Sequence, residues 1–206
     1  MYPKIVVSKI SGIKNTDQVI IKNRYSSLLS LPSKSLVWSP GIDFKVSHFN
    51  DVAIPDLMSE NNISFVVNLG VGEKLTSKHL IELELGVISC HPGRLPDFKG
   101  SMCPEWALYA GQPIYNSIFR MDYEYDEGPV LREKEIKFSY PIKYEDFRTR
   151  IFVEGIDLLV QTISSLISDE LTSKDFITRR GGNTFRPMND DTFNELNRRY
   201  FTNDAR

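Results

Sequence analysis

A single histidine stands where an apolar run meets a loop rich in proline and glycine. In "GVISCHPGRLP" (86–96) the run ends at His91, and Pro92 and Gly93 follow it directly. A second turn, "DEGP", contains Asp126. An imidazole changes its charge near neutral pH, and a carboxylate beside it fixes the tautomer and raises the basicity of the ring. His91 and Asp126 therefore predict a proton-transfer pair, with a purely structural hydrogen-bonding role for His91 as the alternative.

Cys90 directly precedes His91 and raises the alternative of a thiol triad made of Cys90, His91 and Asp126. Adjacent residues of a strand point to opposite faces of its sheet. We therefore expect Cys90 to face the core and His91 to face a cleft. The other cysteine, Cys103, does not form a CxxC pair with Cys90, so the sequence predicts neither a disulfide framework nor a zinc site.

The elements that must position these side chains alternate between strands and helices in the first half of the chain. The pattern predicts strands at 4–7, 44–48, 63–70 and 86–90, and helices at 54–62 and 76–85. This alternation favours a parallel sheet with right-handed crossovers. In open sheets of this kind ligands bind outside the carboxyl ends of the strands, which is where His91 lies.

The second half predicts a helix at 103–111, a strand pair at 115–126 and 128–139 around the Asp126 turn, and a long helix. One face of the long helix is defined by Phe147, Ile151, Gly155, Leu158, Thr162 and Leu166. The predicted fold class is α/β, with a mostly parallel Rossmann-like sheet, helices on both faces and an antiparallel hairpin. We expect one catalytic domain over residues 1–170 with a shortened N-terminal part, and a C-terminal extension, residues 171–206, packed on it.

Composition narrows the classes of protein. The chain has 206 residues, of which 41% are hydrophobic and 25% charged, and its formal net charge is −2. A block of consecutive basic residues is absent, so a nucleic-acid binder is not predicted. No apolar run approaches the ~18 residues of a membrane span, and the N-terminal apolar run is too short for a secretory signal. We therefore expect a cytoplasmic protein.

The segment "HPGRLPDFKGSMCPEWALYAGQP", followed by "DEGPVL", resembles the folate-dependent formyltransferases. Their hallmark is an Asn-x-His-Pro strand end, a Leu-Pro-x-x-x-Gly loop and an Asp-x-Gly turn at a set distance. The matching residues are His91, Leu95, Pro96, Gly100, Asp126 and Gly128. The resemblance covers residues 60–170, and the details "CHPG" and "EWALY" are most similar to nucleotide-sugar N-formyltransferases of surface-polysaccharide pathways.

This resemblance implies transfer of a formyl group from N10-formyltetrahydrofolate to the amine of a nucleotide-linked amino sugar. Attack of the amine gives a tetrahedral intermediate with an oxyanion, so the site must remove a proton and stabilise negative charge. His91 is expected to do both in turn, and Asp126 to orient it. Ser89 occupies the place of the family's asparagine and offers one donor on a shorter arm. The nearest asparagine, Asn68, is expected on another strand, from which it could substitute only from the side. The predicted catalytic residues are thus His91, Asp126 and Ser89.

Two segments are expected to line the folate pocket, the loop 71–76 and the stretch 121–126. The predicted cofactor-binding residues are Lys74, Leu75, Met121, Asp122, Tyr123 and Tyr125. A half-exposed strand is the alternative explanation for the two alternating tyrosines. The residues predicted to bind substrate are Pro92, Gly93 and Arg94, which follow His91. The expected partner is a nucleotide-linked amino sugar, and the protein could form a homodimer. We expect it to bind no metal, nucleic acid or membrane.

Other members of the family fit the sequence less well. No glycine-rich phosphate loop follows "KIVVSKISG", which argues against a glycinamide-ribotide transformylase. The further C-terminal barrel of methionyl-tRNA formyltransferases is not expected within 206 residues, nor is a basic face. Two alternatives to sugar formylation stay open: a formyltetrahydrofolate hydrolase, and a weakly active relative that binds folate or a nucleotide sugar.

Overall fold

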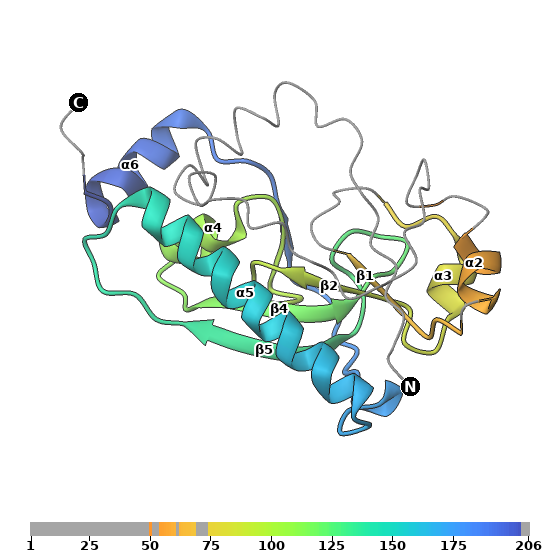
Figure 1. Cartoon of the computed structure of the whole chain (residues 1–206). Helices are drawn as coiled ribbons and strands as arrows, with labels where there is room; N and C mark the ends of the chain where they lie inside the picture. The colour runs from red at the N-terminus through yellow and green to blue at the C-terminus, as the bar shows by residue number, and fades with distance from the viewer. Residues whose placement is uncertain (1–49, 51–53, 61, 69–73, 203–206) are drawn as a thin grey trace.

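The computed structural model of the chain describes residue 50 and residues 54–60, 62–68 and 74–202 (Figure 1). The strands expected at 4–7 and 44–48 lie outside the described residues, as do residues 71–73 of the expected folate loop. Of the helices that are described, none is both long and apolar enough to cross a membrane.

A four-stranded sheet in the order β1-β2-β4-β5 forms the centre of the fold. The strands are β1 (Val66–Asn68), β2 (Val87–His91), β4 (Ile114–Arg120) and β5 (Val130–Ile136). β1 and β2 are parallel, β4 is antiparallel to β2, and β5 is antiparallel to β4. The strands β1, β2 and β5 therefore share one direction and β4 alone is reversed, which confirms a mostly parallel sheet with an antiparallel hairpin.

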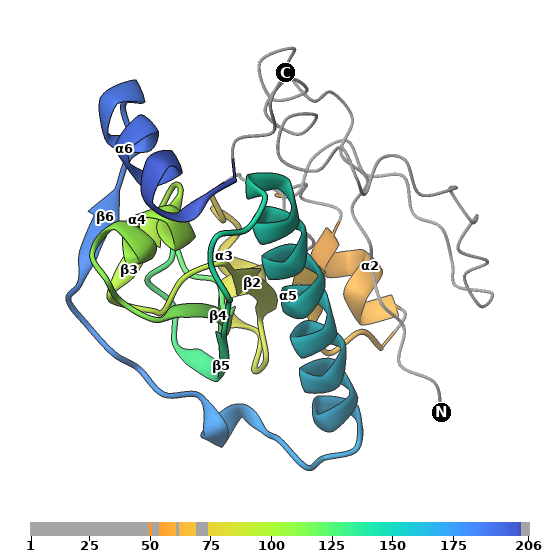
Figure 2. The ribbon, with the colours of Figure 1, turned by 90° about the vertical axis from the view of Figure 1, so that its left-hand side faces the viewer.

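One face of the sheet is covered by the long helix α5 (Tyr144–Ile167) (Figure 2). Every residue of its predicted core face is buried. A Cβ atom added to Gly155 would lie 3.0 Å from the Sγ of Cys90 on β2, so glycine lets the helix approach the sheet closely. The helix thereby supports, from behind, the strand that ends in the predicted catalytic histidine.

The opposite face carries shorter helices. α2 (Ile54–Glu60) and α3 (Lys78–Glu82) share an apolar cluster with Val66 of β1 and Val87 of β2. The next residue of each strand packs instead toward α5, as the two-residue period of a strand requires. α4 (Cys103–Tyr109) contacts β4 and packs against the first turns of α5, where its buried Glu105 pairs with Arg148 at 3.2 Å. The α/β class with helices on both faces is therefore confirmed.

Near the C-terminus, α6 (Asp190–Tyr200) packs its buried Leu196 with residues of α4 and the first turns of α5. The helix begins at Asn189, whose side chain accepts a hydrogen bond from the N–H of Thr192 at 2.9 Å. This capping bond satisfies one of the free N–H groups of the first turn. The proposed domain boundary after residue 170 stays a prediction.

A second, smaller sheet was not predicted from the sequence. β3 (Phe98–Gly100) and β6 (Asn183–Phe185) form a parallel pair of three residues each. A 3₁₀ helix, Ser173–Asp175, precedes β6. The small sheet brings the C-terminal part of the chain onto the loop that follows His91.

The first strand of the hairpin is shorter than predicted. β4 ends at Arg120 and residues 121–127 form a loop, so the predicted strand at 115–126 is wrong at its C-terminal end. Asp126 adopts a left-handed φ of 58°, which a strand does not accommodate. Tyr123 and Tyr125 are accordingly exposed loop residues, at 47% and 48%, and not alternating strand residues.

Candidate active site

A cavity of about 430 Å³ opens at the carboxyl ends of β1 and β2, where the topology places ligand sites in such sheets. Residues from both strand ends, from the 121–126 loop and from β6 surround it. They are Asn68, Lys74, Leu75, Ser89, Cys90, His91, Gly100, Ser101, Phe119, Met121, Asp122, Glu124, Tyr125, Asp126 and Thr184. Predicted catalytic residues and most of the predicted cofactor residues therefore share one cavity.

His91 and Asp126 lie together in this cavity, as their spacing predicted. The Nδ1 atom of His91 is 3.3 Å from Oδ1 of Asp126, and its Nε2 is 2.8 Å from the carbonyl oxygen of Phe98. A carbonyl oxygen can only accept, so Nε2 carries a proton and Nδ1 faces the carboxylate. A proton between Nδ1 and Asp126 makes this second contact a hydrogen bond. The pair can therefore give or take one proton at the cavity wall.

Asp126 is held by the backbone as well as by His91. Its Oδ2 accepts a hydrogen bond from the N–H of Gly100 at 2.8 Å, and its side chain is only 16% exposed. Asp126 has a left-handed backbone conformation, and its carboxylate points toward Gly100 of β3. The hydrogen bond from Gly100 thus holds the carboxylate beside His91.

The loop after His91 owes its shape to a close contact with the ring. A Cβ atom on Gly93 would lie 2.7 Å from Nε2 of His91 and 2.7 Å from the carbonyl oxygen of Phe98. The hydroxyl of Ser117, which is fully buried, donates to the Gly93 carbonyl at 2.7 Å. The absence of a side chain at Gly93 therefore makes room for the imidazole of His91.

The three residues predicted to bind substrate are placed differently. Pro92, Gly93 and Arg94 are not among the residues found to surround this cavity in the described part of the chain. The guanidinium of Arg94 lies 5.1 Å above the ring of Tyr115 and 4.0 Å from Glu133. Their assignment as substrate contacts stays a prediction.

The cysteines do not belong to the proton-transfer pair. The Sγ of Cys90 packs toward Gly155 of α5, on the face opposite to His91. Burial raises the pKa of the Cys90 thiol to about 12, and burial together with nearby Asp126 and Glu105 raises the pKa of Cys103 as well. Both thiols stay protonated at neutral pH, which removes the basis for the thiol-triad alternative.

Asn68 borders the cavity, although the sequence predicted for it only a substitute role from the side. It is the register partner of Ser89 in the parallel pair β1–β2, and both side chains are buried, at 6% exposure each. The Nδ2 of Asn68 contacts the thioether sulfur of Met121 at 3.2 Å, and the hydroxyl of Ser89 lies 3.5 Å from the Asn68 carbonyl. A thioether is a weak acceptor. Asn68 borders the cavity from the strand beside Ser89.

The predicted cofactor-binding residues divide into two groups. Five of them border the cavity: Lys74, Leu75, Met121, Asp122 and Tyr125. Tyr123 is absent from the cavity wall within the described residues. At the cavity mouth the Nζ of Lys74 pairs with Glu124 at 2.6 Å and lies 5.6 Å from the Tyr125 ring centre.

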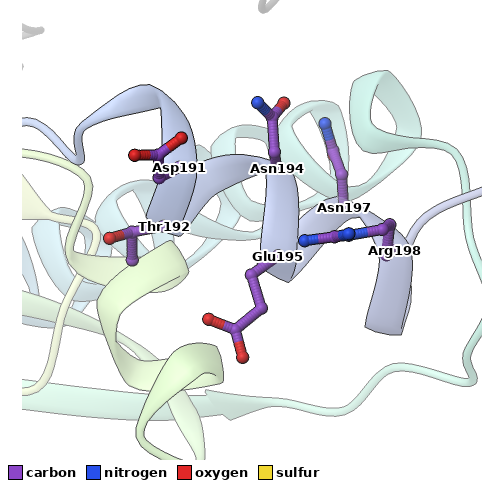
Figure 3. A pocket seen from close by; sticks show the side chains of 6 residues that line it. All are labelled: Asp191, Thr192, Asn194, Glu195, Asn197 and Arg198. Carbon is purple, nitrogen blue, oxygen red and sulfur yellow. The ribbon is translucent and has the colours of Figure 1, made fainter.

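A larger hollow of about 700 Å³ runs along α6 (Figure 3). Its side chains come from this helix alone: Asp191, Thr192, Asn194, Glu195, Asn197 and Arg198. They include neither a histidine nor a buried carboxylate, so the hollow lacks a group suited to proton transfer. Among the described residues there is also no cluster of three or more histidine, cysteine or carboxylate side chains placed to hold a metal ion.

Several curated proteins are similar to this chain in sequence. Methionyl-tRNA formyltransferase from Thermodesulfovibrio yellowstonii is 29% identical over 115 residues, which are 55% of this chain and 37% of that protein. The corresponding enzyme from Clostridium novyi is 25% identical over 154 residues, 73% of this chain and 50% of that protein. The chain thus spans about half or less of the length of these curated relatives.

Solved structures of sugar-modifying enzymes share the fold at low identity. The formyltransferase PseJ from Anoxybacillus kamchatkensis superposes with a TM-score of 0.57 and 16% identity, covering 88% of this chain and 85% of that one. A sugar N-formyltransferase from Shewanella sp. gives 0.54 and 18%, covering 88% and 75%. The family model described as formyl transferase matches residues 7–163, more than half of the sequence. The chain belongs to the formyl transferase family.

Proposed function

We propose that this protein transfers a formyl group from N10-formyltetrahydrofolate to the amine of a nucleotide-linked amino sugar in surface-polysaccharide biosynthesis. The observation that carries the proposal is the His91–Asp126 pair beside two buried donors, Asn68 and Ser89, in one cavity. The solved PseJ structure, which covers 88% of this chain, is a complex with a formamido UDP-sugar and tetrahydrofolate. That likeness supports both the donor and the class of acceptor.

The cavity fits a reduced folate in size and chemistry. Its volume of about 430 Å³ lies within the range usual for cofactor sites. Leu75, Phe119 and Met121 give it an apolar wall for a flat ring, and Tyr125 and Lys74 stand at its mouth. When bound there, N10-formyltetrahydrofolate supplies an activated formyl carbon. Leu75, Phe119 and Met121 would hold it, and Lys74 would bind a carboxylate of its tail by exchanging its present partner Glu124.

His91 and Asp126 handle the proton of the acceptor amine. A sugar ammonium must lose a proton before its nitrogen can attack, and the pair takes up that proton between Nδ1 of His91 and Oδ1 of Asp126. The Phe98 carbonyl keeps Nε2 protonated, so the ring cannot turn to present its other nitrogen without losing this bond. The fixed tautomer leaves Nδ1 as the nitrogen that can share a proton with Asp126.

Asn68 and Ser89 handle the negative charge. The formyl oxygen gains charge as the amine attacks, and preorganised donors in a water-poor site stabilise such charge. The amide of Asn68 borders this cavity and can donate to the charged oxygen, and the Ser89 hydroxyl can join it from the next strand. A donor on β1 thus accompanies the serine on β2.

A second acceptor is supported by the sequence relatives. The curated proteins that match at 25–29% identity are methionyl-tRNA formyltransferases, so the amine of a charged tRNA is the alternative acceptor. The formal net charge of −2 favours the sugar, since binding of nucleic acid relies on a basic surface.

A single assay separates these functions. The full chain is incubated with N10-formyltetrahydrofolate and either nucleotide-linked amino sugars, methionyl-tRNA or no acceptor, and product masses and formate are followed. The proposal expects a formamido sugar that is absent with His91→Ala. If formylmethionyl-tRNA is the product, the acceptor is the tRNA-bound amine and not the sugar. If formate is released without any acceptor, the protein is a hydrolase.

A further inference from the structure

The small strand β3 touches both members of the catalytic pair through its backbone. The carbonyl of Phe98 accepts from Nε2 of His91, and the N–H of Gly100 donates to Oδ2 of Asp126, each at 2.8 Å. Three consecutive residues therefore set the tautomer of the imidazole and the position of the carboxylate. Whatever holds β3 also holds the 3.3 Å contact between His91 and Asp126.

β3 is held by a part of the chain that lies far away in sequence. We define the C-terminal segment as residues 181–188; its strand β6 is the strand partner of β3 in the described part of the chain. At one end the N–H of Asn183 donates to the carbonyl of Asp97 at 3.2 Å. At the other end the N–H of Ser101 donates to the carbonyl of Phe185 at 2.9 Å.

A buried lysine strengthens this attachment. Lys99, the central residue of β3, is only 5% exposed, and its Nζ donates to the carbonyl of Gly181 at 2.9 Å. The same Nζ forms an ion pair with Glu127, the neighbour of Asp126. A buried ammonium requires such partners, so the lysine ties the C-terminal segment to the Asp126 turn.

Aromatic stacking also holds the C-terminal segment against β3 and α4. The ring of Phe185 lies between Phe98, at 5.2 Å and 13°, and Trp106, at 5.3 Å and 27°. The indole Nε1 of Trp106 donates to the carbonyl of Arg186 at 2.8 Å. The C-terminal segment is thereby fixed to α4 as well as to β3.

Gly182 shows how tightly the segment lies on the loop. Its φ is +74°, and a Cβ atom would lie 1.7 Å from the carbonyl oxygen of Pro96. Backbone cannot yield by such a distance, so a side chain at this position must lift the segment away from the loop.

We infer that the C-terminal segment is a positioning element of the active site: it presses β3 against His91 and Asp126 and so maintains the proton-transfer pair. Thr184 also borders the cavity, so the segment contributes to its wall. Where activity is measured, the inference rests on the proposed function. The tautomer of His91 can be read without turnover, which separates failure of the inference from failure of the function.

The test compares two glycine substitutions. Gly182→Ala places a methyl group against Pro96, whereas Gly111→Ala at the end of α4 has a similar φ of +64° and no atom within 4 Å of the added Cβ. The variants share the backbone strain, and only the first disturbs the loop. We expect kcat to fall by about 10-fold to 100-fold in Gly182→Ala, the usual cost of a small misplacement, with the KM for the formyl donor little changed. Gly111→Ala should retain its kcat.

The spectroscopic arm uses ¹⁵N chemical shifts of the histidine rings, which report the nitrogen that carries the proton. The chain has three histidines, and His91→Ala identifies the His91 signals. Wild type and Gly111→Ala should show His91 protonated at Nε2, and Gly182→Ala should show a mixture of tautomers. Phe185→Leu removes the aromatic stack and keeps most of the apolar volume, so it should also give a mixture of tautomers. It replaces Gly182→Ala in the test if that variant does not fold.

Two results would overturn the inference. One is a wild-type His91 spectrum in folded Gly182→Ala or Phe185→Leu. The other is an equal loss of kcat in Gly182→Ala and Gly111→Ala, which would reduce the effect to backbone strain. A wild type that transfers no formyl group would count against the proposed function alone, because the spectra would still decide the positioning role.

Discussion

Asn68 and Ser89 stand side by side on parallel strands, where neighbouring backbones are about 4.8 Å apart. Replacing Asn68 by alanine removes the amide and leaves the β1–β2 backbone pairing in place. We expect Asn68→Ala to lower kcat by about 10²–10³, the usual effect of losing one preorganised donor, and to change KM much less. Steady-state kinetics check this, with Asn194→Ala on the exposed side of α6 as the control. An unchanged kcat would show that the amide does not meet the reacting oxygen.

Ser89 allows a reciprocal experiment. An asparagine at position 89 would bring a second amide into the same buried space, so Ser89→Asn alone should give little gain or a loss of kcat through crowding. In the Asn68→Ala background the space is open. There Ser89→Asn should recover at least about tenfold in kcat, because the new amide replaces the lost donor. Failure of the double variant to exceed Asn68→Ala would mean that position 89 does not face the formyl group.

The cysteines give a prediction about reactivity. Because burial raises the pKa of Cys90 to about 12 and also raises that of Cys103, both are thiols and not thiolates at pH 8. Iodoacetamide should therefore label the folded protein slowly at this pH and label both cysteines after denaturation in urea. Mass spectrometry of peptides that contain Cys90 or Cys103 gives the extent of labelling at each residue. Rapid modification of Cys90 accompanied by loss of activity would return the thiol triad to consideration.

At the scale of elements, α5 depends on one small residue for its contact with the sheet. Gly155→Val would force a branched side chain toward Cys90, where even a Cβ atom lies at 3.0 Å. We expect the free energy of unfolding to fall by about 1–3 kcal/mol, as in other overpacked cores. Urea denaturation measures this, with Val160→Ala on the exposed side of α5 as the control. A stable Gly155→Val protein would mean that the helix docks more loosely than its packing indicates.

The elements differ in how far the sequence predicts them. Six apolar or small residues at helical spacing predicted α5. Continuous apolar runs predicted β1 and β2. β3 and β6 have three residues each and pair across some eighty residues, which no local pattern encodes. The end of β4 was misplaced because Tyr123 and Tyr125 continue the alternation of a strand into an exposed loop.

The site follows the same division. His91 and Asp126 were predicted because a histidine at a strand end and an aspartate in a turn are visible one at a time, and family spacing linked them. Asn68 was considered only as a substitute from another strand, because its place depends on the register that sets it beside Ser89. Gly182 also gains its meaning from a contact with another part of the chain, at Pro96.

The whole molecule should lose stability in alkaline solution. Cys90 and Tyr140 have pKa values raised to about 12 in the folded chain, by burial in both cases. The unfolded chain releases these protons at lower pH than the folded chain, so stability is retained below pH 9 and lost as pH rises toward 12. Thermal melts from pH 7 to 11 should show a falling Tm, with a shallower fall in Cys90→Ala. An equal slope in the two proteins would assign the loss to other groups.

The pairing of β3 with β6 also has a consequence for how the protein is made. A ribosome that has just placed His91 in the chain must add some ninety further residues before Phe185 can stack on Phe98, which at ordinary rates of translation takes roughly 5–20 s. During that interval the central sheet can assemble while β3 still lacks its partner strand. If the proposed positioning role holds, a nascent chain forms its central sheet before the geometry of His91 and Asp126 is fixed.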